Sequence, residues 1–131
     1  MPLELFSLIV DDYDAAIDFF TVSLGFDLVE DTPSTTTDGR PKRWVVVRPA
    51  DGGPGLLLAR ADGPEQLAAT GRQFAGRVGL FLRVQDFDDT LHRVRQAGCE
   101  VIRPPRSEPY GRVAVVQDPW GNLWDVLGDP S

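Results

Sequence analysis

The chain has 131 residues, of which 42% are hydrophobic and 25% are charged, values that are ordinary for one globular domain. Its net charge of −7 argues against binding to nucleic acid or to an anionic membrane surface, because both recruit Lys and Arg. The single cysteine, Cys99, excludes an internal disulfide, and no apolar run is long enough to span a bilayer. The start of the chain lacks the basic residues of a signal peptide, so the expected location is the cytoplasm.

The first half of the chain is predicted to form a strand, a helix and further strands. Residues 3–10 are rich in apolar residues and are predicted to form a strand. A helix is expected from about Asp14 to Gly25, which has the residue type of a helix C-cap. An extended segment restarts at 26–29, and the polar residues 32–42 are predicted to be a loop. Two strands complete this half: 43–48 and 55–59.

The second half repeats this order after a polar segment. Residues 60–76 are predicted to be a connector that contains a short helix at 64–69. A strand at 78–84 precedes a helix that starts near Asp88 and ends at Gly98. The remaining segments are three strands, 100–102, 112–117 and 123–127, with a loop at 104–110 and a turn at 118–122.

The two halves share one pattern of residues. Val10–Asp14 matches Val84–Asp88 in its aromatic-Asp pair, and Gly25 and Gly98 close helices of nearly equal length. We therefore predict an α+β fold of two βαβββ modules in tandem, which form a curved mixed-sheet cup. The expected boundaries within a single domain, 1–131, are module one at 3–59, a connector at 60–76 and module two at 77–128.

The first strands of both modules have one apolar face and one mixed face. The apolar faces are expected to pack under the helices: Phe6, Leu8, Val10, Leu80, Leu82 and Val84. The opposite faces carry Leu5, Ser7, Ile9, Gly79, Phe81 and Arg83. A mixed face in a two-layer fold is either solvent-exposed or the wall of a cavity.

Three segments carry a resemblance to a known family. Leu8–Phe20, Leu24-Gly25-Phe26 and Asp118–Val126 resemble the vicinal oxygen chelate superfamily, which includes glyoxalase I, bleomycin-resistance proteins and extradiol dioxygenases. The resemblance implies paired βαβββ modules, usually in a homodimer, with a site in the cup of each sheet.

The resemblance also identifies four positions where metal-using members place ligands to a divalent ion. These positions hold Leu5, Leu57, Gly79 and Asp125 here, and only Asp125 has a ligand atom. The one histidine, His92, is expected on the surface of the second helix. We therefore expect no metal and no cofactor.

The favoured function is metal-free binding of a small molecule in the sheet cup or in a dimer groove, as in sequestration by bleomycin-resistance proteins. The expected ligand-binding residues are Asp125, Ser7, Trp44, Phe81, Arg83, Tyr110 and Trp120. Trp124 is expected in the core, and the acidic balance of the chain suits a cationic ligand. Asp125 could instead pair with Arg83 or Arg112.

Two other functions remain open. A lyase, isomerase or dioxygenase-type enzyme could use Asp125 as acid or base, Arg83 to hold an anion and Tyr110 as a proton donor. The sequence assigns no catalytic residue beyond this alternative, because no nucleophile–base pair is present. An interaction module, whose dimer interface is the function, is the third possibility.

Overall fold

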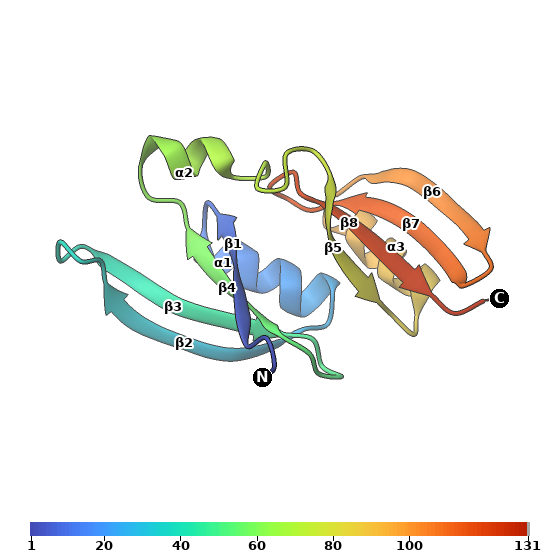
Figure 1. The fold of residues 1–131 in the computed structure, drawn as a ribbon, viewed down its shortest axis with the longest axis horizontal. Helices are drawn as coiled ribbons and strands as arrows, with labels where there is room; N and C mark the ends of the chain where they lie inside the picture. Colours follow the sequence, from blue (N-terminus) through green and yellow to red (C-terminus); the bar gives the residue numbers. More distant parts are fainter. Residues whose placement is uncertain (131) are drawn as a thin grey trace. The chain divides into compact units, whose positions relative to one another are not determined.

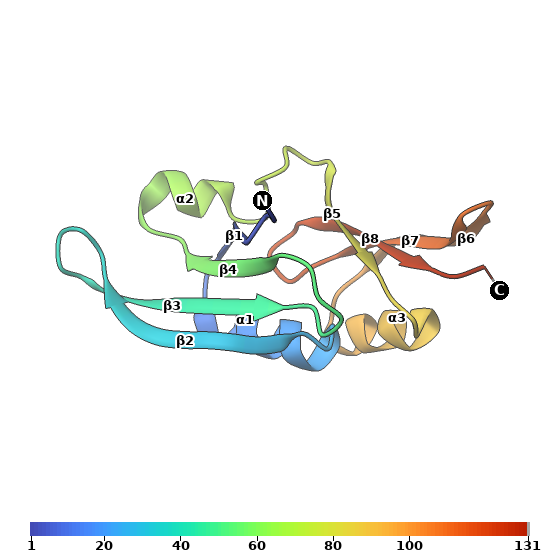
Figure 2. The same ribbon diagram turned by 60° about the horizontal axis from the view of Figure 1, so that its bottom comes forward.

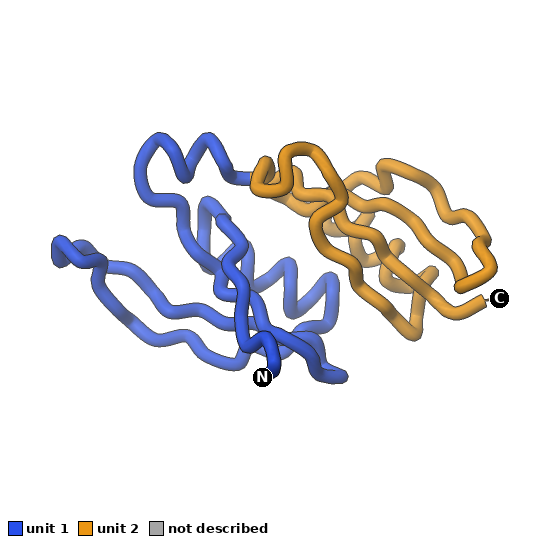
Figure 3. The backbone as a smooth tube through the Cα atoms, in the orientation of Figure 1, with its two compact units in different colours: residues 1–70 blue, residues 71–131 orange. Residues whose placement is uncertain are grey.

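The computed structural model describes residues 1–130. The chain divides into two compact units, Met1–Thr70 and Gly71–Ser131, coloured separately in Figure 3. Among the described residues, no helix is both long and apolar enough to cross a membrane.

Unit 1 holds a four-stranded mixed sheet in the order β1-β4-β3-β2. Strands β1 and β4 are parallel, and the other neighbours are antiparallel. Its elements are β1 (Leu5–Val10), α1 (Tyr13–Asp18), a π-helical turn η1 (Phe19–Ser23), β2 (Asp27–Thr35), β3 (Pro41–Arg48), β4 (Gly55–Arg60) and α2 (Gly63–Ala69) (Figure 1).

Unit 2 repeats this topology in the order β5-β8-β7-β6, with β5 parallel to β8. Its elements are β5 (Val78–Arg83), α3 (Phe87–Gln96), β6 (Val101–Glu108), β7 (Gly111–Gln117) and β8 (Leu123–Gly128). The predicted tandem of βαβββ modules is confirmed, and the short helix expected at 64–69 is α2.

Local chemistry explains where the helices begin and end. The carboxylate of Asp12 accepts a hydrogen bond from the backbone N–H of Ala15 at 3.0 Å, which caps α1. Gly25 follows the π-helical turn with φ +71°, a left-handed conformation that favours glycine. Gly98 takes the same role after α3 with φ +83°.

In each unit one helix, α1 or α3, covers one face of the sheet, and the core lies between this helix and the sheet (Figure 2). Leu8 and Val10 of β1 are fully buried there, as the apolar strand face predicted, while Phe6 at the start of the strand is 37% exposed. In unit 2 the same layer is made by α3 and the strands, from Leu80, Phe87, Leu91, Val94, Trp124 and Val126. The prediction that Trp124 belongs to the core is confirmed.

Two predicted loops are wrong. Residues 32–42 are mostly strand, because β2 continues to Thr35 and β3 starts at Pro41. The connection is short and is closed by a hydrogen bond from the Thr36 N–H to the Arg40 carbonyl at 2.8 Å. Threonine suits extended backbone, so pairing with β3 prevails over the polar composition.

The segment 104–110 is strand up to Glu108. It contains Pro104 and Pro105, which cannot donate to a ladder. Strand β6 accommodates them because it lies at the edge of the sheet and its register shifts between Arg103 and Arg106.

Candidate functional site

Strands β3 and β4 of unit 1 separate soon after they pair. Their only register partners within the described residues are Val46 with Leu57 and Val47 with Leu56. Figure 1 shows β4 running on towards α2 while β3 continues to the β2–β3 hairpin. The corresponding strands of unit 2, β7 and β8, stay paired from Arg112 to Gln117. The separation therefore belongs to module one alone.

Side chains bridge the separated strands. The Tyr13 hydroxyl accepts a hydrogen bond from the backbone N–H of Arg43 at 3.2 Å. The Arg60 guanidinium donates to the Pro41 carbonyl at 3.3 Å. Both groups are on the edge of β3 that β4 has left, where they would otherwise lack a partner. These backbone groups at the opening therefore have hydrogen-bond partners although β4 is not paired with them.

Two guanidinium groups lie over the Tyr13 ring. Arg43 is 5.1 Å and Arg60 is 5.0 Å from its centroid, both within cation–π range. Continuing the register of β3 and β4 would set these two arginines opposite each other, so Tyr13 occupies the place of the missing pairs.

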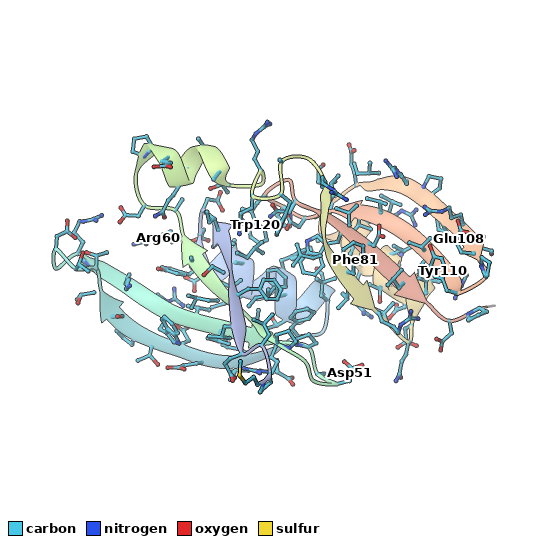
Figure 4. All side chains as sticks on the ribbon, viewed as in Figure 1. Asp51, Arg60, Phe81, Glu108, Tyr110 and Trp120 are labelled. Carbon is cyan, nitrogen blue, oxygen red and sulfur yellow. The ribbon has the colours of Figure 1, made fainter. Side chains whose placement is uncertain are left out.

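A cavity of about 420 Å³ occupies the opening. Trp44, Leu57 and Ala59 give it an apolar wall. The β2–β3 connection and the start of α2 form other parts of the lining, through Thr36, Thr37, Arg40, Asp62 and Gln66. Figure 4 labels Arg60 between β3 and α2. This volume lies within the range of small-molecule pockets.

Arg40 links two parts of the cavity lining. Its guanidinium donates to both carboxylate oxygens of Asp62, at 2.7 and 2.9 Å, and also pairs with Asp38 at 3.1 Å. The bidentate bond with Arg40 lowers the pKa of Asp62. The β2–β3 connection is thereby fastened to the start of α2.

The open face of the sheet in unit 2 carries other predicted residues. Phe81 and Asp125 are register partners on adjacent strands, so their side chains share this face. Phe81 is 65% exposed and Asp125 is half-buried. Asp125 pairs with neither of the expected arginines, because Arg112 bonds to Asp88 at 3.1 Å and Arg83 lies 3.8 Å from Asp129.

The predicted ligand residues do not gather within one unit. Trp44 lines the cavity of unit 1, and Ser7 lies on the adjacent strand pair, opposite Leu57. Tyr110 and Trp120 lie at opposite ends of the β7–β8 hairpin (Figure 4). His92 is exposed on α3, as expected.

The sequence profile of the Glyoxalase/Bleomycin resistance protein/Dioxygenase superfamily matches residues 3–126. The chain belongs to this superfamily. An uncharacterised protein of Shewanella frigidimarina (strain NCIMB 400) is 50% identical over 122 residues, which are 92% of this chain and 88% of that protein.

Two solved structures of the superfamily fold are similar over almost the whole chain. TnmS3, an antibiotic binding protein from Streptomyces sp. CB03234, is 32% identical with a TM-score of 0.73, and the match covers 100% of this chain and 97% of TnmS3. A glyoxalase family protein from Bacillus cereus is 18% identical with a TM-score of 0.80, covering 100% and 95% of the two chains. The second likeness concerns the fold alone.

The metal ligand positions of the superfamily do not fit a metal in this chain. Gly79 has no side chain, and a Cβ built on it would lie 2.1 Å from Cγ of Phe74, so the aromatic ring fills the space of a ligand. Leu5 and Leu57 lack ligand atoms. Within residues 1–130, no cluster of three or more His, Cys, Asp or Glu residues could hold a metal ion.

The turn before β8, part of the superfamily resemblance, is organised by Asp118. Its buried carboxylate accepts hydrogen bonds from the N–H groups of Trp120, Gly121 and Asn122, and from the side chains of Asn122 and Trp124. Burial raises the pKa of Asp118, and these hydrogen bonds oppose the increase. This turn therefore has a structural role and fixes where Asp125 lies on β8.

Several cavity residues were missed by the sequence reasoning: Tyr13, Arg40, Lys42, Arg43, Arg60 and Asp62. Most lie in the segments interpreted as polar loop and connector. The available signal was the cluster Arg40, Lys42 and Arg43 in an otherwise acidic chain. A cluster of this kind is more often part of a solvated surface than of a binding site, so it did not identify the cavity.

Proposed function

We propose that this chain binds and sequesters a small molecule without a metal, and that the cavity between β3 and β4 is a principal part of its binding site. The cavity of about 420 Å³ carries this proposal. It combines a small apolar wall, formed by Trp44, Leu57 and Ala59, with a larger number of polar and charged groups, so it suits a ligand that carries both an apolar and a polar part. The 32% identity with TnmS3, which binds an antibiotic, supports the same class of function.

We propose the open face of unit 2, with Asp125 and Phe81, as a second candidate binding surface, independent of the cavity in unit 1. Phe81 leaves a large apolar ring exposed beside a carboxylate that has no ion-pair partner among the described residues. We also propose that the protein acts as a homodimer, which light scattering at several concentrations would test.

A thermal-shift screen with aromatic, cationic and thioester compounds tests the function. A ligand at a hundredfold excess over its Kd adds about 2.7 kcal/mol to the free energy of unfolding, which gives a clear shift. Trp44→Leu is expected to reduce the shift. Phe6→Leu is the matched control, because Phe6 is 37% exposed, close to the 38% of Trp44, and does not line the cavity.

Each outcome of the screen has a definite meaning. A ligand whose shift falls in Trp44→Leu and persists in Phe6→Leu supports binding in the cavity. Equal shifts in both variants remove the cavity from the site, and Asp125→Ala then tests the open face of unit 2. A panel without any stabilising compound contradicts the proposed function.

A further inference from the structure

We propose that the ligand of the β3–β4 cavity is an aromatic acid, with its ring against Trp44 and its carboxylate between Lys42 and Arg60. This assignment rests on the proposed function and specifies its ligand class. It departs from the expectation drawn from the net charge of −7, which favours a cationic ligand.

The charges that line the cavity are mostly positive. They are Arg40, Lys42, Arg43 and Arg60, with Asp62 as the lining carboxylate. Two of the arginines are already neutralised. Arg43 pairs with Asp14 at 3.0 Å and with Asp31 at 2.7 Å, and Arg40 pairs with Asp38 and Asp62.

Lys42 and Arg60 are the remaining cations. Neither has a carboxylate within ion-pair distance among the described residues. Arg60 uses one of its nitrogens on the Pro41 carbonyl and its face on the Tyr13 ring, so further N–H donors are available. An anion that enters the cavity therefore meets two cations that line it, and it can pair with them without breaking an existing ion pair.

The geometry around Arg60 also holds its guanidinium in place before a ligand arrives. The bond to Pro41 and the contact with Tyr13 restrict a side chain that is otherwise flexible. Fixing a donor in advance reduces the entropy lost on binding. A planar carboxylate matches the fork of a guanidinium better than a neutral group does.

Part of the cavity lining is apolar and includes one large ring. Trp44 is 38% exposed, and it lines the cavity together with Leu57 and Ala59. An indole with a free face stacks favourably on another aromatic ring. The site thus pairs a surface for a ring with donors for an anion, which is the recognition pattern of an aromatic acid.

Three probes with one ring system test the assignment: 1-pyrenecarboxylate, its uncharged amide and 1-pyrenemethylammonium. Fluorescence titration of the purified full chain is expected to show the carboxylate binding about tenfold more tightly than the amide, with the ammonium compound weakest. Raising the salt concentration should weaken binding of the carboxylate probe and leave binding of the amide probe unchanged, because salt screens the partly exposed cations.

Variants test the cationic residues and the aromatic residue of the cavity independently. Lys42→Gln and Arg60→Gln are each expected to weaken binding of the carboxylate probe about three- to tenfold and to leave binding of the amide probe unaffected. Trp44→Leu should weaken both probes. Arg95→Gln removes the same charge from exposed α3 outside the cavity and should change neither affinity. If Arg60→Gln disturbs the fold, Lys42→Gln alone still decides the result.

The outcomes distinguish this inference from the function on which it rests. Three results would overturn the aromatic-acid assignment. They are equal binding of the three probes, tightest binding of the ammonium compound, and an unchanged affinity of Lys42→Gln for the carboxylate probe. The assignment also fails if none of the probes binds. In each case the proposed function stands if the thermal-shift panel still gives a ligand, and it falls only if that panel gives none.

Discussion

The Tyr13 hydroxyl accepts a hydrogen bond from the backbone N–H of Arg43 at 3.2 Å, on the edge of β3 where β4 is missing. This bond lets the two strands separate without leaving the Arg43 N–H unsatisfied. Tyr13 comes from the helix that follows β1, so the opening depends on a residue outside the strands that form it.

Tyr13→Phe tests this relationship. The variant keeps the ring that contacts Arg43 and Arg60 but removes the acceptor, and we expect the free energy of unfolding to fall by about 1–2 kcal/mol. Urea denaturation measures it. Tyr110→Phe is the control, because Tyr110 is 55% exposed and should change stability by less than about 0.5 kcal/mol. Equal stability of both variants would contradict the role of the hydroxyl.

Asp118→Asn is expected to destabilise unit 2 by about 2–4 kcal/mol. One carboxylate oxygen accepts from Asn122 Nδ2 and from Trp124 Nε1, both at 3.0 Å, and an amide NH₂ in that place would face two donors. Thermal unfolding followed by Trp fluorescence measures the loss. Asp27→Asn, at an exposed position, is the control. A stability like that of the control would show that the turn does not need the carboxylate.

Gly79→Ala should destabilise the chain by about 1–3 kcal/mol, because the new methyl group overlaps the Phe74 ring. The double variant Gly79→Ala with Phe74→Ala is the check. If the clash is the cause, Gly79→Ala should lower the free energy of unfolding much less in the Phe74→Ala background, where the ring is absent. Additive losses in the double variant would rule out this explanation.

Asp38 is expected to titrate at about pH 2 in the folded protein. A hydrogen bond from the Thr36 hydroxyl and then the Arg40 guanidinium lower the pKa of Asp38 from 3.8 to about 2. Because the folded pKa lies below the ordinary value, these bonds stabilise the β2–β3 connection above about pH 4, and this contribution is lost as the pH falls towards 2.

NMR of the side-chain carboxyl carbon measures this titration. Thr36→Val should raise the midpoint of Asp38 because it removes the largest cause of the shift. Thr35→Val, one residue earlier and exposed, should leave it unchanged. A wild-type midpoint near 3.8 would contradict the prediction.

Purified protein is expected to contain no stoichiometric transition metal, and chelation should not change its melting temperature. The ligand positions hold Leu5, Leu57 and Gly79 beside the single carboxylate of Asp125. Elemental analysis and isothermal titration with Ni²⁺ and Zn²⁺ measure this. Tight binding of either ion would require a site that uses other residues.

The fold could be predicted from the sequence where the signals are local. Asp12 and Gly25 bound the first helix through capping chemistry, and the uniformly apolar face of β1 identifies Leu8 and Val10 as core. The ends of β2 and β6 could not be predicted, because threonine and proline tracts carry weak local signals and the neighbouring strand decides whether they pair.

Local sequence patterns could not predict the cavity. It depends on where β3 and β4 stop pairing, after Val46 and Leu57, and on Tyr13, which lies 30 residues before its partner Arg43. Strand register and contacts at this separation follow from the packed structure. Trp44 was nevertheless among the residues expected to bind a ligand, and it lines the cavity.

The β7–β8 ladder of module two is unbroken, whereas the β3–β4 pair of module one is open, and this difference affects how the chain can change. In an assembly of identical single modules, one substitution alters every copy at once. Here each copy is encoded separately, so mutations that remodel the pocket in the first need not weaken the second. The tandem of two modules therefore allows the pocket of module one to change while module two keeps its paired strands.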